Sequence, residues 1–171
     1  MKEKNIVLVG FMGVGKSTVS AALAARTGAQ EIDTDAALVA QQGMSISEMF
    51  ARHGEPWFRQ KETELCLSLA EPAGKIISCG GGVVMRQQNV QALRRGGVIV
   101  LLTARPETIL KRVGENDDRP LLRGRKTVEG VQQLLDSRLP AYRAAADLCV
   151  ATDGKTVDEI CTEILRLLSE A

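Results

Sequence analysis

Short apolar runs alternate along this chain with longer stretches in which apolar residues recur every three or four positions. The short runs have the length and β-branched content of strands that are covered on both faces, and the longer stretches have the period of helices. This alternation is typical of an α/β fold with a parallel sheet between two layers of helices. The sequence predicts five strands, at residues 5–9, 30–33, 75–79, 98–103 and 147–151.

Several predicted helices carry their own boundary signals. Pro56 and Pro106 suit the first turn of a helix, where a missing N–H group is not needed. Thr156, with Glu159 three residues later, has the arrangement of a capping box. Pro140 predicts a break or kink inside its helix. The predicted helices span residues 16–26, 45–52, 56–70, 87–95, 106–113, 128–145 and 157–168.

Composition narrows the class of protein. The 171 residues are 44% hydrophobic and 25% charged, which suits one globular domain, residues 1–171. A formal charge of +1 and only 3% aromatic residues argue against nucleic-acid binding, which uses a basic excess or base stacking. No apolar run approaches the roughly 18 residues of a membrane-spanning helix, and no signal-peptide cleavage site is found. We therefore expect a cytoplasmic monomer with no membrane or nucleic-acid partner.

Two further features concern order and redox state. The segment at 114–125 is polar, bounded by glycines and too long for a routine connection, so we interpret it as a mobile lid. The cysteines have no paired spacing that would suggest zinc ligands or a disulfide framework. We expect them to be small buried hydrophobic residues; they are Cys66, Cys79, Cys149 and Cys161.

Residues 10–17 read Gly-Phe-Met-Gly-Val-Gly-Lys-Ser and match the phosphate-binding motif G-x-x-x-x-G-K-[ST], between a predicted strand and a predicted helix. Glycines there turn backbone N–H groups inward, and the helix N-terminus adds positive potential. Lys16 would reach the terminal phosphates and Ser17 would bind Mg²⁺. A glycine-rich turn with a solvated lysine is the weaker alternative. The chain has no N-K-x-D or D-x-x-G sequence, which argues against a GTP-dependent switch.

Asp33 and Asp35 are the candidate carboxylates of this site, because no other predicted apolar strand ends in aspartate. The tip of the second strand lies at the same edge of a parallel sheet as the phosphate loop. One carboxylate would position Mg²⁺, and the other would receive or orient an acceptor hydroxyl. Alternatively both residues cap the following helix, a role that does not exclude chemistry.

Arginines and glycines indicate a site for a small anion at this edge. Arg59 and Glu62 are three apart on one helix, so a structural ion pair is the first interpretation. Arg119 lies in the predicted lid and Arg138 near a helix end, and any one of these arginines alone is most often a solvated charge. The run Gly80-Gly81-Gly82 follows the third strand, where it either forms a tight turn or lets a ligand approach the backbone.

In this order, these elements resemble the shikimate kinase family over nearly the whole chain. The matching elements are residues 10–17, Asp33-Thr34-Asp35, Phe58-Arg59-x-x-Glu62, Gly80-Gly81-Gly82, Arg119-Pro120-Leu121-Leu122 and Arg138-x-Pro-x-Tyr142. The resemblance implies a three-layer P-loop NTPase fold like that of nucleoside monophosphate kinases, with strand order 2-3-1-4-5 and a lid. It also implies an enzyme, a phosphotransferase that uses ATP and Mg²⁺ to phosphorylate the 3-hydroxyl of shikimate on the route to chorismate and the aromatic amino acids.

The resemblance further implies roles for individual residues. Arg59 and Arg138 would clamp the shikimate carboxylate, and Glu62 would hold Arg59. The implied catalytic residues are Lys16, Asp35 and Arg119, and the implied metal ligands are Ser17 and Asp33. ATP would be bound by Gly13, Val14, Gly15, Lys16, Ser17, Thr18, Arg112 and Arg119, and shikimate by Asp35, Arg59, Gly81, Gly82 and Arg138. The segment at 152–155 lacks an arginine that some relatives pack on adenine.

Other interpretations stay open from the sequence. The chain could phosphorylate another small polyol acid such as gluconate, or bind shikimate or nucleotide without catalysis. The joint presence of Lys16, Asp33, Asp35 and Arg119 favours an enzyme over a silent module. Phe50 and Trp57 either wall the acceptor pocket or belong to the core. His53 is expected to be a surface residue at a helix C-terminus.

Overall fold

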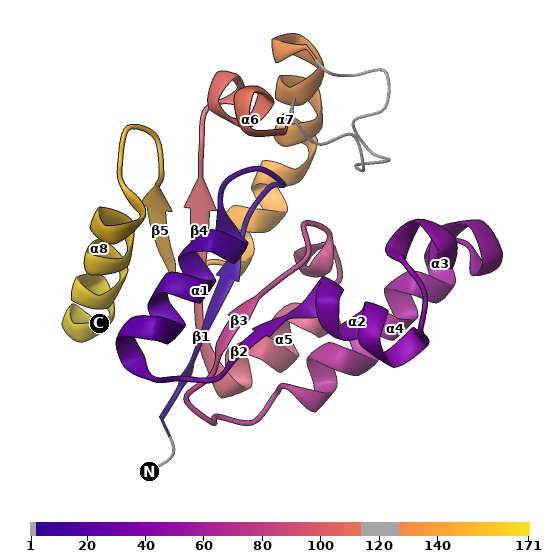
Figure 1. Ribbon diagram of the computed structural model, residues 1–171, viewed down its shortest axis with the longest axis horizontal. Coiled ribbons are helices and arrows are strands. Elements are labelled where there is room, and N and C mark those ends of the chain that lie inside the picture. Colours follow the sequence, from indigo (N-terminus) through magenta and orange to yellow (C-terminus); the bar gives the residue numbers. More distant parts are fainter. Residues whose placement is uncertain (1–2, 114–126) are drawn as a thin grey trace.

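The structure is a computed structural model that describes residues 3–113 and 127–171 (Figure 1). The predicted lid, 114–125, and the candidate catalytic residue Arg119 lie outside the described residues.

A five-stranded parallel sheet forms the middle layer of the fold (Figure 1). Its order is β2-β3-β1-β4-β5, so the predicted order is confirmed. Every predicted strand is present, with ends that differ from the prediction by at most one residue. The strands are β1 (Asn5–Val9), β2 (Glu31–Asp33), β3 (Ile76–Ser78), β4 (Gly97–Thr103) and β5 (Leu148–Ala151).

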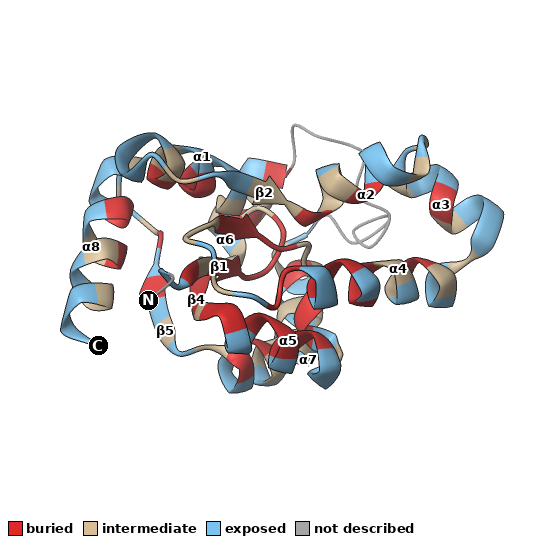
Figure 2. Ribbon diagram, turned by 90° about the horizontal axis from the view of Figure 1, so that it is seen from below, coloured by how far each residue is buried: buried red, intermediate tan, exposed pale blue. Residues whose placement is uncertain are grey.

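Helices cover both faces of the sheet. Figure 2 shows α1 and α8 on one side and α5 and α7 on the other, while α2, α3 and α4 extend to one end of the molecule. In the described part of the chain the helices are α1 (Lys16–Thr27), α2 (Thr34–Gln42), α3 (Ile46–His53), α4 (Glu55–Ser68), α5 (Gln87–Gly96), α6 (Pro106–Val113), α7 (Val128–Ala145) and α8 (Val157–Glu170), and the turn η1 (Val83–Met85) is a 3₁₀ helix.

The core lies where the central strands meet these helices. All of β3 is buried, as are most residues of β1 and β4, because each has neighbours on both sides and helices above and below. The edge strands β2 and β5 are more exposed. Three of the four cysteines are buried as predicted, but Cys149 is exposed, because it lies on the edge strand β5.

The boundary signals have mixed outcomes. Thr156 and Glu159 form the predicted capping box of α8, and Pro56 and Pro106 lie in first turns. Of the predicted break or kink at Pro140, the break is wrong: α7 continues through this residue to Ala145, which is buried with Tyr142 in the last turn. The helix α2 was not predicted.

Within residues 3–113 and 127–171, no helix combines the length and the apolar character needed to cross a membrane.

Candidate active site

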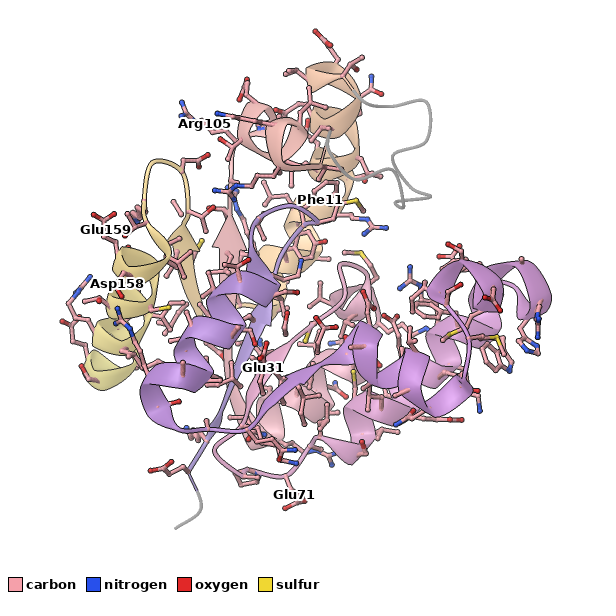
Figure 3. All side chains as sticks on the ribbon, viewed as in Figure 1. Phe11, Glu31, Glu71, Arg105, Asp158 and Glu159 are labelled. Atoms are coloured by element: carbon pink, nitrogen blue, oxygen red, sulfur yellow. The ribbon has the colours of Figure 1, made fainter. Side chains whose placement is uncertain are left out.

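The carboxyl ends of β1, β2 and β3 open onto a cavity of about 670 Å³. Figure 3 places Phe11 at this end of the sheet and Glu71 at the opposite end. The cavity is lined by the phosphate loop and by part of the predicted acceptor set, whereas Arg59, Gly82 and Arg138 are not among its lining residues. From the first group come Gly13, Gly15, Lys16, Ser17, Thr18 and Arg112, and from the second Asp33, Asp35, Gly80 and Gly81.

The loop after β1 has the backbone of a phosphate cradle. Gly13 and Gly15 have φ values of 81° and 99°, in the left-handed region that favours glycine. A Cβ atom on Gly13 would also lie 2.6 Å from Cγ2 of Val113. Gly15 precedes α1 and supplies no side-chain cap, so the first N–H groups of α1 suit a bound anion. Lys16 Nζ donates to the carbonyl oxygens of Gly10, at 2.6 Å, and Phe11, at 3.1 Å, which holds it across the loop.

Asp33 caps the following helix and also contacts Ser17 of the phosphate loop. Its Oδ1 accepts a hydrogen bond of 3.0 Å from the backbone N–H of Ala36 and so caps α2. Its Oδ2 accepts one of 3.1 Å from Oγ of Ser17. Two candidate oxygen ligands, from the first turn of α1 and the end of β2, thus lie side by side, although β3 separates β1 from β2 in the sheet.

This pair suits a hydrated Mg²⁺ ion better than a protein-only metal cage. Among the described residues, no cluster of three or more His, Cys, Asp or Glu side chains could hold a metal. Mg²⁺ commonly keeps several waters and uses one or two protein oxygens together with substrate phosphates. The donor set of Ser17 and Asp33, next to the phosphate loop, fits that pattern.

The triple-glycine loop lies against the acceptor carboxylates. A Cβ atom on Gly80 would lie 2.7 Å from Oδ1 of Asp35 and 3.3 Å from Oε2 of Glu62, so only glycine lets both approach. The backbone N–H of Gly80 donates to the buried hydroxyl of Thr34 at 2.8 Å. The sequence did not predict this role of Thr34. The available signal was the position of Thr34 between the two candidate aspartates.

The predicted ion pair of Arg59 and Glu62 is present, with Nη1 of Arg59 2.7 Å from Oε1 of Glu62. The Glu62 side chain is only 1% exposed. Burial raises the pKa of its carboxyl, against the opposing effect of the Arg59 charge, and the nearby Asp35 charge adds to the rise. Arg59 also faces the glycine loop, because a Cβ atom on Gly82 would lie 2.7 Å from its Cζ.

Arg138 approaches the same loop from α7. Its Nη1 lies 3.6 Å from where a Cβ atom on Gly81 would be, and that nitrogen is buried with no hydrogen-bond acceptor among the described residues. The Tyr142 hydroxyl donates to the carbonyl oxygen of Gly81 at 2.6 Å. Arg59 and Arg138 therefore reach adjacent glycines from different helices, as expected of groups that clamp one carboxylate.

Arg112 lies over the phosphate loop. Its Nη1 donates to the carbonyl oxygens of Gly13, at 3.2 Å, and Val14, at 3.0 Å, and to the hydroxyl of Thr152, at 3.3 Å. In the segment that lacks the expected arginine, Thr152 thus helps to orient Arg112.

Asp153, the next residue, ties this segment to the start of α6. Its carboxylate accepts from the Arg105 N–H at 3.0 Å and from the Thr108 hydroxyl at 2.7 Å. Burial alone would raise the pKa of Asp153, but these hydrogen bonds and the Arg105 charge outweigh it and lower the pKa.

The aromatic candidates lie away from the cavity lining described above. Phe50 packs against Phe58 with ring centroids 4.9 Å apart, and Trp57 stacks on His53 at 4.1 Å. Phe50 and Trp57 therefore support the packing of α3 against α4. His53 is exposed at the end of α3, as predicted.

Comparisons with known proteins identify the family of this chain. The sequence model of the family described as shikimate kinase matches residues 12–169. A shikimate kinase from Geobacter sulfurreducens is 44% identical over 167 residues, which cover 98% of this chain and 92% of that protein. The solved structure of a shikimate kinase from Acinetobacter baumannii in complex with shikimate has a TM-score of 0.92 and 31% identity, covering 98% of this chain and 94% of the other.

A more distant structure, a gluconokinase from Sinorhizobium meliloti, has a TM-score of 0.58 and 17% identity, covering 98% of this chain and 92% of the other, a likeness of fold alone. The family match and the Geobacter relative, in contrast, extend over almost all of the chain. That chain brings a phosphate loop and two carboxylates to one cavity, and two arginines to the glycine loop beside it. This chain belongs to the shikimate kinase family.

Proposed function

We propose that this enzyme transfers the γ-phosphoryl group of ATP to the 3-hydroxyl of shikimate, forming shikimate 3-phosphate and ADP. The observation that carries the proposal is the approach of Arg59 and Arg138 to adjacent glycines, beside a cavity that the phosphate loop also lines. The planar guanidinium group matches a carboxylate in shape and charge, and shikimate is a small hydroxylated acid. The Acinetobacter relative was solved with shikimate bound, which supports the same substrate class here.

On the nucleotide side, the backbone of Gly13, Val14 and Gly15 and the first turn of α1, including Thr18, would surround the phosphates. Lys16 would exchange its carbonyl partners for the terminal phosphates, and Arg112 would lie along the nucleotide over the loop. Ser17 and Asp33 would hold Mg²⁺, which supplies charge neutralisation at the phosphate oxygens.

On the acceptor side, Arg59 and Arg138 would bind the carboxylate, and Gly81 and Gly82 would lie against the ring. Asp35 would orient the 3-hydroxyl and accept its proton as the hydroxyl oxygen forms a bond to the γ-phosphorus. The bond from that phosphorus to the bridging oxygen then breaks, and ADP leaves. Such a reaction depends mainly on positioning and electrostatic stabilisation.

The role expected of Arg119, at the transferring phosphate, belongs to a segment outside the described residues and stays a prediction. The monomeric state of the enzyme and its location in the cytoplasm also stay predictions. Both ligand sites are built from one chain, which supports the monomer, and light scattering after size-exclusion chromatography tests it.

A panel of acceptors tests the proposal. The purified chain is incubated with ATP, Mg²⁺ and either shikimate or gluconate, ADP release is followed, and the product is identified by mass spectrometry. We expect turnover with shikimate. Turnover with gluconate but not shikimate would show that the substrate is another polyol acid. Binding of shikimate without turnover would indicate a protein that binds it without catalysis.

A further inference from the structure

The triple-glycine loop is held at two points by buried hydroxyl groups from different elements. Thr34, in the first turn of α2, accepts the N–H of Gly80 at 2.8 Å, and Tyr142, on α7, donates to the carbonyl oxygen of Gly81 at 2.6 Å. Both side chains belong to buried residues, each 1% exposed. A short hydrogen bond in a buried setting restricts the groups that it joins, so the position of this loop depends on its two anchors.

Tyr142 links the acceptor loop to the nucleotide loop. Its ring lines a mostly apolar cavity of about 210 Å³ together with Phe11 and Val14 of the phosphate loop, and its hydroxyl reaches Gly81. Arg138 lies four residues earlier on the same helix, and side chains at this spacing lie on one helix face. A Cβ atom on Gly81 would lie 3.6 Å from the Tyr142 hydroxyl oxygen and also 3.6 Å from Nη1 of Arg138.

We infer that Tyr142 is a positioning residue for recognition of the acceptor carboxylate, because its hydroxyl holds Gly81 and the Arg138 guanidinium in a fixed relation. This inference rests on the proposed function, since it assumes that Arg138 binds the carboxylate of shikimate. The Tyr142 hydroxyl already donates to the carbonyl oxygen of Gly81, so it acts through the loop and Arg138.

The hydroxyl is suited to this role at neutral pH. Burial raises the pKa of Tyr142 above its ordinary value, against the opposing charge of Arg138. The group therefore remains a protonated donor to Gly81, and its positioning effect is expected to be constant between pH 6 and about 9.

Substitution Tyr142→Phe removes the hydroxyl and keeps the aromatic ring of a residue that lines a small cavity with Phe11 and Val14. We expect the KM for shikimate to rise about three- to tenfold, the effect of losing one buried hydrogen bond, with the KM for ATP changed less than about twofold. The matched control is Ser68→Ala, which removes a hydroxyl that donates to the Leu65 carbonyl oxygen, also at 2.6 Å, in the last turn of α4. We expect that control to leave both KM values unchanged.

A double-mutant cycle identifies the path of the effect. In an Arg138→Ala background, Tyr142→Phe should change the KM for shikimate less than about twofold, because its target is gone. The methyl ester of shikimate lacks the carboxylate charge. Tyr142→Phe should therefore raise the KM for this ester by a smaller factor than it raises the KM for shikimate.

Three results would overturn the inference: a KM for shikimate that Tyr142→Phe leaves unchanged, equal rises in both KM values, or a full effect that persists without Arg138. Failure of the proposed function itself is distinguishable, because the unmodified enzyme would then show no phosphorylation of shikimate at all.

Discussion

Gly82 offers the sharpest test of how Arg59 is held in the acceptor site. The substitution Gly82→Ala adds one methyl group, whose carbon would lie 2.7 Å from Cζ and 2.8 Å from Nη2 of Arg59. Carbon atoms in favourable contact are about 3.5–4.0 Å apart, so the guanidinium group must move by about 1 Å. The backbone itself tolerates alanine, because Gly82 has φ −97° and ψ 0°.

The expected effect is a loss of acceptor affinity in a stable protein. A hydrogen bond to a charged group contributes about 1.5–3 kcal/mol, which corresponds to a factor of roughly 10 to 150 in an equilibrium constant. We therefore expect the KM for shikimate to rise about 10- to 100-fold. The KM for ATP should stay within about twofold, and the free energy of unfolding should change by less than about 1 kcal/mol.

The assay is coupled ADP release during shikimate and ATP titrations, together with urea unfolding. Gly43→Ala is the control of opposite character: Gly43 follows α2 with φ 66°, and a Cβ there would meet nothing within 4 Å. Left-handed backbone costs alanine about 1–2 kcal/mol, so this variant should lose stability and keep both KM values. An unchanged shikimate KM in folded Gly82→Ala would refute the placement of Arg59 at this glycine.

Three further predictions address the acceptor residues. Asp35→Asn should retain ATP binding, measured by calorimetry, and lose most turnover; unchanged turnover would remove Asp35 from the reaction. Arg138→Ala should raise the KM for shikimate at least about tenfold more than that for ATP, and equal effects would contradict its contact with the carboxylate. For Glu62, whose pKa is raised in the folded state, the folded protein binds more protons than the unfolded chain above pH 4.5. The unfolding free energy of the unmodified enzyme should therefore fall relative to that of Glu62→Gln as pH rises from 4.5, measured by urea denaturation; a difference that is independent of pH would contradict the raised pKa.

The elements that the sequence predicted well are those with strong local signals. Central strands are mostly apolar, and α8 begins with a capping box, so apolar runs and caps were sufficient. The helix α2 was missed because its apolar residues form one unbroken run, 36–40, which has no helical period. Its ends were nevertheless marked, by Asp33 as the cap and Gly43 in the left-handed region.

The candidate site also has parts that a local sequence signal predicts and parts that depend on long-range contacts. The phosphate loop is a contiguous motif, and the arginines of the acceptor site came from the family resemblance. The anchors Thr34 and Tyr142 could not be predicted, because they bind Gly80 and Gly81 across 46 and 61 residues of sequence. Such contacts depend on how α2 and α7 pack against the loop. Exposure of Cys149 was likewise set by the place of β5 at the sheet edge.

The path of the chain has a consequence for redesign. Helices α2, α3 and α4 all lie between β2 and β3 in the sequence and extend together from one end of the molecule (Figure 2). They carry Asp35, Arg59 and Glu62, whereas Lys16, Ser17 and Arg112 come from other parts of the chain. If the proposed roles hold, this contiguous cassette carries three of the groups that would choose the phosphate acceptor, and transplanting it between family members would alter substrate choice with the nucleotide machinery left in place.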